Sequence, residues 1–269
     1  MNAFEKSIAL LDSGVGGLTV VKEIMKQLPK ENIVYFGDTA RMPYGPRPHE
    51  EVRRFALQII DFLQTQEIKM AIVACNSATA AGLPYYKKEL DIPVLGVIEP
   101  GVRAALAHTR TKRIGVIGTK GTIESGEYER AIKKLAPDAV VCSRACPLFV
   151  LIVENNLSHT PEARRVAEEY LLPLKEQGVD TLILGCTHYP LLQDVIADVM
   201  GEDVHLISSA EETAREARQI LEDYGLLNPS EDEPRYRFFI SSKPPVFEEI
   251  GRKILGRDIK AYQVVLDDI

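Results

Sequence analysis

The chain has 269 residues, of which 45% are hydrophobic and 26% are charged, and this composition excludes an intrinsically disordered protein. Its formal net charge of −7 argues against a nucleic-acid-binding protein, which needs a concentrated basic surface. No apolar run approaches the roughly 20 residues that cross a membrane, and the first residues lack the pattern of a signal peptide. We therefore expect a cytoplasmic protein that binds neither nucleic acid nor a membrane.

Short apolar runs of strand length alternate along the chain with longer segments of helical periodicity. The predicted strands are Ile8–Leu11, Ile33–Phe36, Met70–Ala74, Val94–Val97, Ile114–Ile117, Val140–Val141, Thr181–Leu184, Val204–Ile207 and Tyr236–Ile240. The clearest predicted helices are Glu50–Leu63, Ala163–Leu174, Gln193–Met200 and Glu211–Leu221. This alternation predicts an α/β fold with mainly parallel sheets, flanked by helices on both faces.

The two halves of the chain resemble each other. With a shift of 111 positions, Cys75 falls on Cys186, and seven residues before it also fall on identical ones: Glu51, Arg53, Arg54, Ala56, Leu63, Gln66 and Ile72. Nearer the start, the shift shortens to 106 and places Ile8–Asp12 over Ile114–Gly118. Any two strand–helix units look somewhat alike, but identities that persist at one shift favour an internal duplication.

The duplication predicts two pseudo-symmetric α/β domains. We expect residues 1–97 and 208–269 to form the first domain, which carries Cys75, and residues 98–207 to form the second, which carries Cys186. Ligands of parallel α/β sheets bind beyond the carboxyl ends of the strands. The active site is therefore expected in the cleft between the two domains.

The first predicted strand ends in Asp12-Ser-Gly-Val-Gly-Gly17. A dinucleotide site is excluded because Thr19 stands where that motif needs a glycine, and no lysine completes a P-loop. We expect the glycines to bring backbone N–H groups close to a ligand carboxylate, while Asp12 faces an ammonium group. The alternative is a tight turn in which Asp12 only caps the helix.

Four cysteines are too few for a disulfide framework in a chain of this length, so all are expected to be free thiols. Cys142 and Cys146 are expected to be structural.

Cys75 and Cys186 each follow a buried strand and precede a helix, whose N-terminus is expected to lower the thiol pKa. A metal site is disfavoured because only His188 lies nearby. Two opposed thiols suit the inversion of a carbon, in which one removes a proton and the other delivers one.

Six segments resemble, in the same order and across nearly the whole chain, those of bacterial glutamate racemases: LLDSGVGGLTV, FGDTARMPYG, ACNSATA, VIGTKGTIES, PLFVLIVE and LGCTHYPLL. The resemblance implies a homodimer that interconverts L- and D-glutamate without a cofactor or metal and supplies D-glutamate for peptidoglycan. It also implies that Cys75 takes the α-proton from the D-isomer and Cys186 takes it from the L-isomer. Ser77 departs from the threonine usual in the family, and Leu151 from a common proline.

The resemblance implies the other site residues as well. Asp12, Glu154 and His188 would assist the proton transfers, and the substrate would be bound by Asp12, Ser13, Tyr44, Gly45, Asn76, Ser77, Thr187 and His188. Without the resemblance, Tyr44-Gly45 indicates only a turn and Glu154 only a solvated helix end. The remaining histidines are expected at the surface or in loops: His49, His108, His159 and His205.

Two other functions remain open from the sequence. One is a racemase for aspartate or another acidic amino acid on the same fold. The other is a non-catalytic protein that binds an amino acid in the same cleft. The first differs from a glutamate racemase in substrate preference, and the second in the absence of proton exchange.

Overall fold

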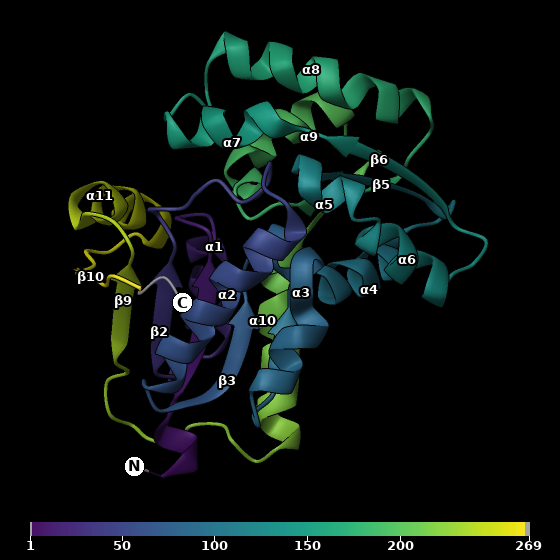
Figure 1. Ribbon diagram of the computed structural model, residues 1–269. Coiled ribbons are helices and arrows are strands. Elements are labelled where there is room, and N and C mark those ends of the chain that lie inside the picture. The colour runs from purple at the N-terminus through teal and green to yellow at the C-terminus, as the bar shows by residue number, and fades with distance from the viewer. Residues whose placement is uncertain (1, 267–269) are drawn as a thin grey trace.

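The structure is a computed structural model that describes residues 2–266. It contains two sheets, each wholly parallel and flanked by helices on both faces (Figure 1). The α/β fold class predicted from the sequence is therefore confirmed. In the described part of the chain, no helix is both long enough and apolar enough to cross a membrane.

The first sheet has six strands in the order β10-β9-β2-β1-β3-β4. Its strands are β1 (Ser7–Asp12), β2 (Ile33–Gly37), β3 (Ile68–Val73), β4 (Val94–Gly96), β9 (Tyr236–Ile240) and β10 (Ala261–Gln263). Helices α1 (Leu18–Gln27), α10 (Ser209–Asp223) and α11 (Pro244–Leu255) share one buried cluster with this sheet. Helices α2 (His49–Gln64) and α3 (Asn76–Glu89) share the other. We call these elements, with the short helix η1 (Ala3–Glu5), the first lobe.

The second sheet has four strands in the order β6-β5-β7-β8. Its strands are β5 (Arg113–Gly118), β6 (Val140–Ala145), β7 (Thr181–Gly185) and β8 (His205–Ser208). One face is covered by α7 (Pro147–Glu154), α8 (Pro161–Glu176), α9 (Gln193–Met200) and the 3-10 helix η2 (Tyr189–Leu192). The other is covered by α4 (Ile98–His108) and α6 (Glu127–Leu135), and α5 (Lys120–Glu124) follows β5. We call these elements the second lobe.

The two sheets share one strand order. In chain order, the first four strands of each lobe are arranged β2-β1-β3-β4 and β6-β5-β7-β8. Strands β3 and β7 therefore hold equivalent places, and Cys75 and Cys186 follow them. This match supports the internal duplication inferred from the sequence, while the domain boundaries at 97/98 and 207/208 stay predictions.

The predicted strands are found because buried parallel strands are continuous apolar runs. All six residues of β1 and of β3 are buried. The prediction was too short for β6, which continues from Val141 to Ala145. This strand lies at an edge of its sheet and carries exposed Ser143 and Arg144, so its sequence is not apolar throughout.

Candidate active site

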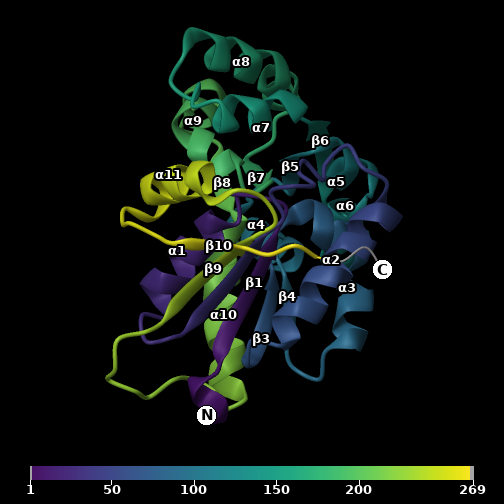
Figure 2. The same cartoon turned by 60° about the vertical axis from the view of Figure 1, so that its left-hand side comes forward.

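The carboxyl ends of β1, β3, β5 and β7 meet at one small cavity between the lobes. The second lobe lies over this end of the first sheet (Figure 2). The cavity is lined by Ser13, Met42, Pro43, Tyr44, Gly45, Cys75, Asn76, Ser77, Thr119, Val150, Glu154, Cys186, Thr187 and His188. Every site residue proposed from the sequence is in this lining except Asp12, which directly precedes Ser13. The structure thus brings the predicted residues together.

Cys75 is the N-cap residue of α3 and is almost fully buried. Its sulfur accepts a hydrogen bond from the Ala78 N–H at 3.5 Å and lies 3.8 Å from Ser13 Oγ. Burial, and then the nearby Asp12, raise the pKa of the Cys75 thiol well above its usual range. The predicted lowering of this pKa is wrong because desolvation outweighs the favourable helix N-terminus.

Cys186 has different neighbours. Its sulfur lies 3.8 Å from Nδ1 of His188, and His188 Nε2 lies 3.2 Å from Glu154 Oε1. Burial alone would lower the pKa of His188, but its hydrogen bonds to Cys186 and Glu154 raise that pKa to about 10. The imidazole of His188 is therefore a cation at neutral pH. A turn and the 3-10 helix η2 follow Cys186, rather than the α-helix expected from the sequence.

Asp12 is completely buried at the end of β1. Its Oδ2 accepts hydrogen bonds from the N–H groups of Gly14 and Gly17, both at 3.0 Å. These two N–H groups are thus occupied by Asp12, in agreement with the alternative that Asp12 caps the turn. Oδ1 has no hydrogen-bond partner among the described residues. Burial raises the pKa of Asp12, although the cationic His188 and the backbone N–H groups oppose this shift.

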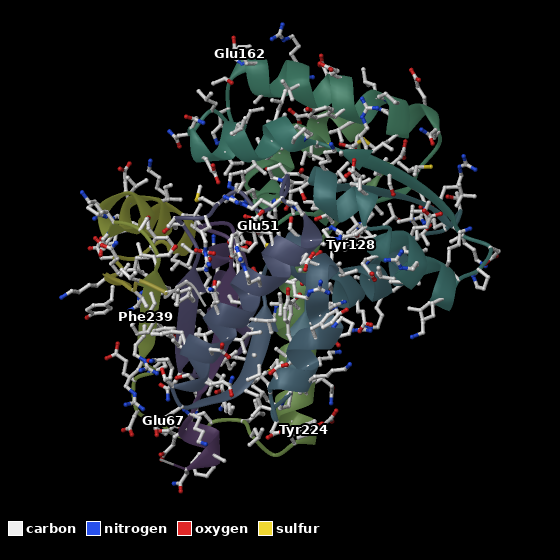
Figure 3. All side chains as sticks on the ribbon, in the orientation of Figure 1. Glu51, Glu67, Tyr128, Glu162, Tyr224 and Phe239 are labelled. Carbon is white, nitrogen blue, oxygen red and sulfur yellow. The ribbon has the colours of Figure 1, made fainter. Side chains whose placement is uncertain are left out.

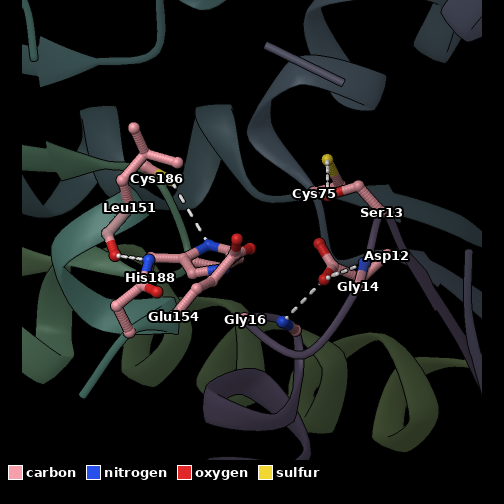
Figure 4. A network of polar contacts seen from close by, with 12 residues as sticks. Asp12, Ser13, Gly14, Gly16, Cys75, Leu151, Glu154, Cys186 and His188 are labelled. Carbon is pink, nitrogen blue, oxygen red and sulfur yellow. Dashed lines mark hydrogen bonds and ion pairs between the residues drawn. The ribbon is translucent and has the colours of Figure 1, made fainter. Parts of the chain in front are cut away.

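Figure 4 shows how these groups are divided between the lobes. Asp12, Ser13 and Cys75 lie on one side of the space, and Cys186, His188 and Glu154 lie on the other. Each sulfur thus has its own set of polar neighbours.

Gly16 brings the turn after β1 against the loop that carries Cys186. A Cβ at Gly16 would lie 2.4 Å from Thr187 Oγ1 and 2.6 Å from His188 Nδ1, so only glycine fits. Thr19 Oγ1 also donates a hydrogen bond to Thr187 O at 3.2 Å. The first lobe therefore supports the loop of the second.

The segment between β2 and α2 supplies Met42, Pro43, Tyr44 and Gly45 to the cavity. The Tyr44 hydroxyl donates to Asp38 Oδ2, so it is already paired within the protein. Asp38 is completely buried and also accepts hydrogen bonds from Arg41 Nε and Ser241 Oγ, both at 2.7 Å. Asp38 was missed in the sequence, although its place directly after a buried strand is the same signal that identified Asp12.

Thr119 is a second residue missed in the sequence. It follows β5, and its Oγ1 lies 3.0 Å from Ser77 Oγ and 3.0 Å from Thr122 Oγ1. The shift of 106 that places Asp12 over Gly118 also places Ser13 over Thr119. The internal repeat therefore carried a signal for this position.

His49 differs from its expected surface position. It is half-buried at the start of α2, and its Nε2 lies 3.1 Å from Gly121 O in the second lobe. Beside it, the Gly121 N–H donates to Gly45 O at 2.9 Å. His108, His159 and His205 are exposed, as expected.

Within residues 2–266, no group of three or more histidine, cysteine, aspartate or glutamate side chains is arranged to hold a metal ion. The cavity lining instead offers two thiols, an imidazole, one carboxylate and several hydroxyls. Such groups are suited to binding a small polar molecule and to moving protons.

Comparison with known proteins agrees with this arrangement. The family model for Asp/Glu/Hydantoin racemase matches residues 11–217. A glutamate racemase from Oceanobacillus iheyensis is 53% identical over 251 residues, which cover 93% of this chain and 92% of the relative. The crystal structure of a glutamate racemase isoform from Bacillus anthracis is 49% identical, with a TM-score of 0.95 over 97% of this chain and 98% of the other.

A glutamate racemase from Francisella tularensis, solved in complex with D-glutamate, is 36% identical with a TM-score of 0.92, over 98% of this chain and 99% of that one. The fold and the site therefore define an isomerase of the amino-acid racemase class. The chain belongs to the Asp/Glu/Hydantoin racemase family.

Proposed function

We propose that this racemase interconverts L- and D-glutamate, with Cys75 and Cys186 as its two acid/base catalysts. The observation that carries the proposal is the position of the two cysteines on opposite sides of one buried cavity (Figure 4). The substrate assignment is supported by the relatives described as glutamate racemases, one of them solved with D-glutamate.

For the L-isomer, the Cys186 thiolate takes the proton from Cα and becomes a thiol. The electron pair of the C–H bond stays on the substrate as a carbanion that is stabilised by its carboxylate. Cys75 then delivers its S–H proton to the opposite face and becomes a thiolate. The D-isomer reacts in the reverse direction, so one proton is taken and one returned, and nothing is oxidised.

The surroundings of the two sulfurs support these starting states. The raised pKa of Cys75 keeps it a thiol, ready to donate. The protonated His188, held by Glu154, lies 3.8 Å from the sulfur of Cys186 and is placed to exchange a proton with it. Reaction of D-glutamate requires a proton on Cys186, which His188 supplies, and a thiolate at Cys75, whose proton Asp12 accepts.

The remaining predicted residues hold the substrate in this proposal. Oδ1 of Asp12, which has no other partner, accepts a hydrogen bond from the ammonium group. The hydroxyls of Ser13, Ser77 and Thr187 donate to the carboxylates, and Asn76 binds the substrate through its side-chain amide. Tyr44 contributes its backbone beside Gly45, since its hydroxyl is bound to Asp38. Donors in a site closed to water stabilise the carbanion more strongly than water does.

The test is proton exchange at the substrate α-carbon. In D₂O, the purified protein should incorporate deuterium at Cα of glutamate and generate the opposite isomer, measured by NMR and circular dichroism. An absence of exchange would favour a non-catalytic binding protein. A higher kcat/KM for L-aspartate than for L-glutamate would show that aspartate is the preferred substrate, and the proposed mechanism would still hold.

The wider role of the product belongs to the same proposal. D-glutamate is a component of peptidoglycan, so we propose that the protein supplies it in the cytoplasm and acts as a homodimer. The resemblance of the whole chain to bacterial glutamate racemases supports this role.

A further inference from the structure

Tyr128 joins the lobes beside the cavity. It lies on α6, is buried, and sits at the boundary between the two lobes (Figure 3). Its hydroxyl accepts a hydrogen bond from Asn76 Nδ2, on α3 of the first lobe, at 2.6 Å. Ser209 Oγ, at the start of α10, lies 3.4 Å from the same hydroxyl. One side chain therefore connects three elements from distant parts of the chain.

The partner of Tyr128 is a cavity residue. Asn76 directly follows Cys75 and is only 3% exposed. Its Oδ1 is buried without a hydrogen-bond partner among the described residues. Because a buried acceptor without a partner is costly, such an atom at a cavity wall marks a place where a ligand donates a hydrogen bond.

The hydroxyl of Tyr128 pairs with the Nδ2 end of the Asn76 amide, so Oδ1 is the end that remains unpaired. Burial raises the pKa of Tyr128 well above its usual range, so the phenol keeps its proton. It can then donate to Ser209 and accept from Asn76 at the same time. When the phenol donates to Ser209, its oxygen accepts from Nδ2 of the amide, which is the orientation found in the structure.

Other buried tyrosines of the chain show what a purely structural hydroxyl does. The hydroxyls of Tyr86 and Tyr189 donate to the backbone oxygens of Ala78 and Cys146, at 3.1 and 2.9 Å. The Tyr128 hydroxyl instead holds a side chain that can rotate. A half-turn of that amide would exchange an acceptor for a donor at the cavity wall.

We propose that Tyr128 is a positioning residue of the racemase: its hydroxyl holds the Asn76 amide so that Oδ1 accepts a hydrogen bond from the substrate ammonium group. Tyr128 is not part of the cavity lining and acts through Asn76. The inference rests on the proposed function, because it concerns the same substrate. Since the bond crosses between the lobes, the amide is held in this way only while the lobes are together.

The variant that tests the inference is Tyr128→Phe, which removes one oxygen and keeps the ring. We expect KM for both isomers of glutamate to rise about tenfold, as for the loss of one hydrogen bond, with a smaller change in kcat. The matched control is Tyr170→Phe, a buried tyrosine of the same lobe whose hydroxyl contacts the backbone of Leu148. The control should retain the wild-type KM.

A double-mutant cycle shows whether Tyr128 acts through Asn76. The variant Asn76→Ala should raise KM by itself, and adding Tyr128→Phe should produce no further loss. Effects that multiply in the double variant would overturn the inference, as would an unchanged KM in Tyr128→Phe. A large fall in Tm with a matching loss of activity would also overturn it, since the hydroxyl would then serve the fold.

Proton exchange by the wild-type protein separates the two proposals. If the wild type does not exchange the α-proton of glutamate, the proposed function fails and this inference fails with it. If the wild type exchanges and Tyr128→Phe behaves identically, only the role of Tyr128 is lost.

Discussion

Cys75 and Cys186 are identical side chains in different surroundings, with Ser13 next to the first sulfur and His188 next to the second. A serine hydroxyl is a much weaker acid than a thiol and cannot replace either one. We therefore expect Cys75→Ser and Cys186→Ser each to reduce kcat for racemisation by about a hundredfold to ten-thousandfold. This range is the usual contribution of a general acid or base. The measurement is kcat in both directions by circular dichroism.

Proton exchange distinguishes the roles of the two cysteines. Cys75→Ser retains Cys186 and should still exchange the α-proton of L-glutamate in D₂O without forming the D-isomer, and Cys186→Ser should do the same for D-glutamate. Cys142→Ser, a buried cysteine outside the cavity, is the control and should racemise normally. Near-normal turnover by either cavity variant would remove that cysteine from the mechanism.

The raised pKa of His188 predicts how stability depends on pH. The pKa changes from 6.5, its ordinary value, to about 10 in the folded state. The stabilisation is therefore complete below about pH 6.5 and is lost as the pH rises through 10. We expect His188→Gln to lower the free energy of unfolding more at pH 6 than at pH 10, measured by urea denaturation. His159→Gln, at an exposed position, should show no such difference, and an equal loss at both pH values in His188→Gln would contradict the prediction.

Among single residues, the two cysteines could be predicted because each follows a recognisable buried strand. Asn76 and Tyr128 are 52 positions apart, and Ser77 and Thr119 are 42 apart. Such pairs are created by the packing of the lobes and leave no local pattern. The pKa of Cys75 could not be predicted either, because the sequence indicates a helix start but not the degree of burial.

At the scale of elements, the turn between β1 and α1 has a function beyond connecting them. A methyl group at Gly16 would displace Thr187 or His188, since it would lie within 2.8 Å of both. A displacement of about 1 Å at a reacting group costs about a hundredfold in rate. We therefore expect Gly16→Ala to reduce kcat/KM about a hundredfold, measured from initial rates at limiting glutamate.

A second glycine provides the control for this experiment. Gly225 follows α10 with a φ of +64° and has no neighbour within 4 Å of an added Cβ. Gly225→Ala should cost about 1–2 kcal/mol of stability through backbone strain and leave kcat/KM unchanged. Equal activity in the two variants would show that the Gly16 contact does not support the site.

Most elements were predictable because burial gives them a recognisable period. Strand β9, far from the other strands in sequence, was found from its own apolar run. Its pairing with β2 was not readable, since strand order depends on contacts between distant segments. The edge strand β6 is longer in the structure than in the prediction, because its exposed residues are polar and interrupt the apolar run.

For the whole molecule, stability depends on a buried ion pair at the end of the first sheet remote from the cavity. Lys69 Nζ lies 2.5 Å from Glu31 Oε2, and both side chains are 2% exposed. The ammonium group also donates to the backbone oxygens of Phe4 and Leu226, at 2.6 and 2.8 Å. It thereby ties together the N-terminal segment, β3 and the segment after α10.

Removing one member of this pair leaves a buried charge unpaired. We expect Lys69→Met to lower the free energy of unfolding by about 3–5 kcal/mol, measured by urea denaturation. The double variant Lys69→Met/Glu31→Gln should recover part of that loss, because it buries no net charge. The activity per folded molecule should be unchanged in both, and a fall in kcat without a fall in stability would contradict this separation.

The contact of Gly16 with Thr187 and His188 also constrains the order of events in a catalytic cycle. Most of the residues around the cavity are buried, so we expect an amino acid to enter or leave when the lobes or the segment after β2 move apart. Any such movement of the lobes also withdraws Gly16 from the loop that positions Cys186. If the lobes separate, the proposed mechanism therefore predicts that an enclosed molecule is inverted several times before it escapes, whereas the opened protein exchanges ligand without inverting it.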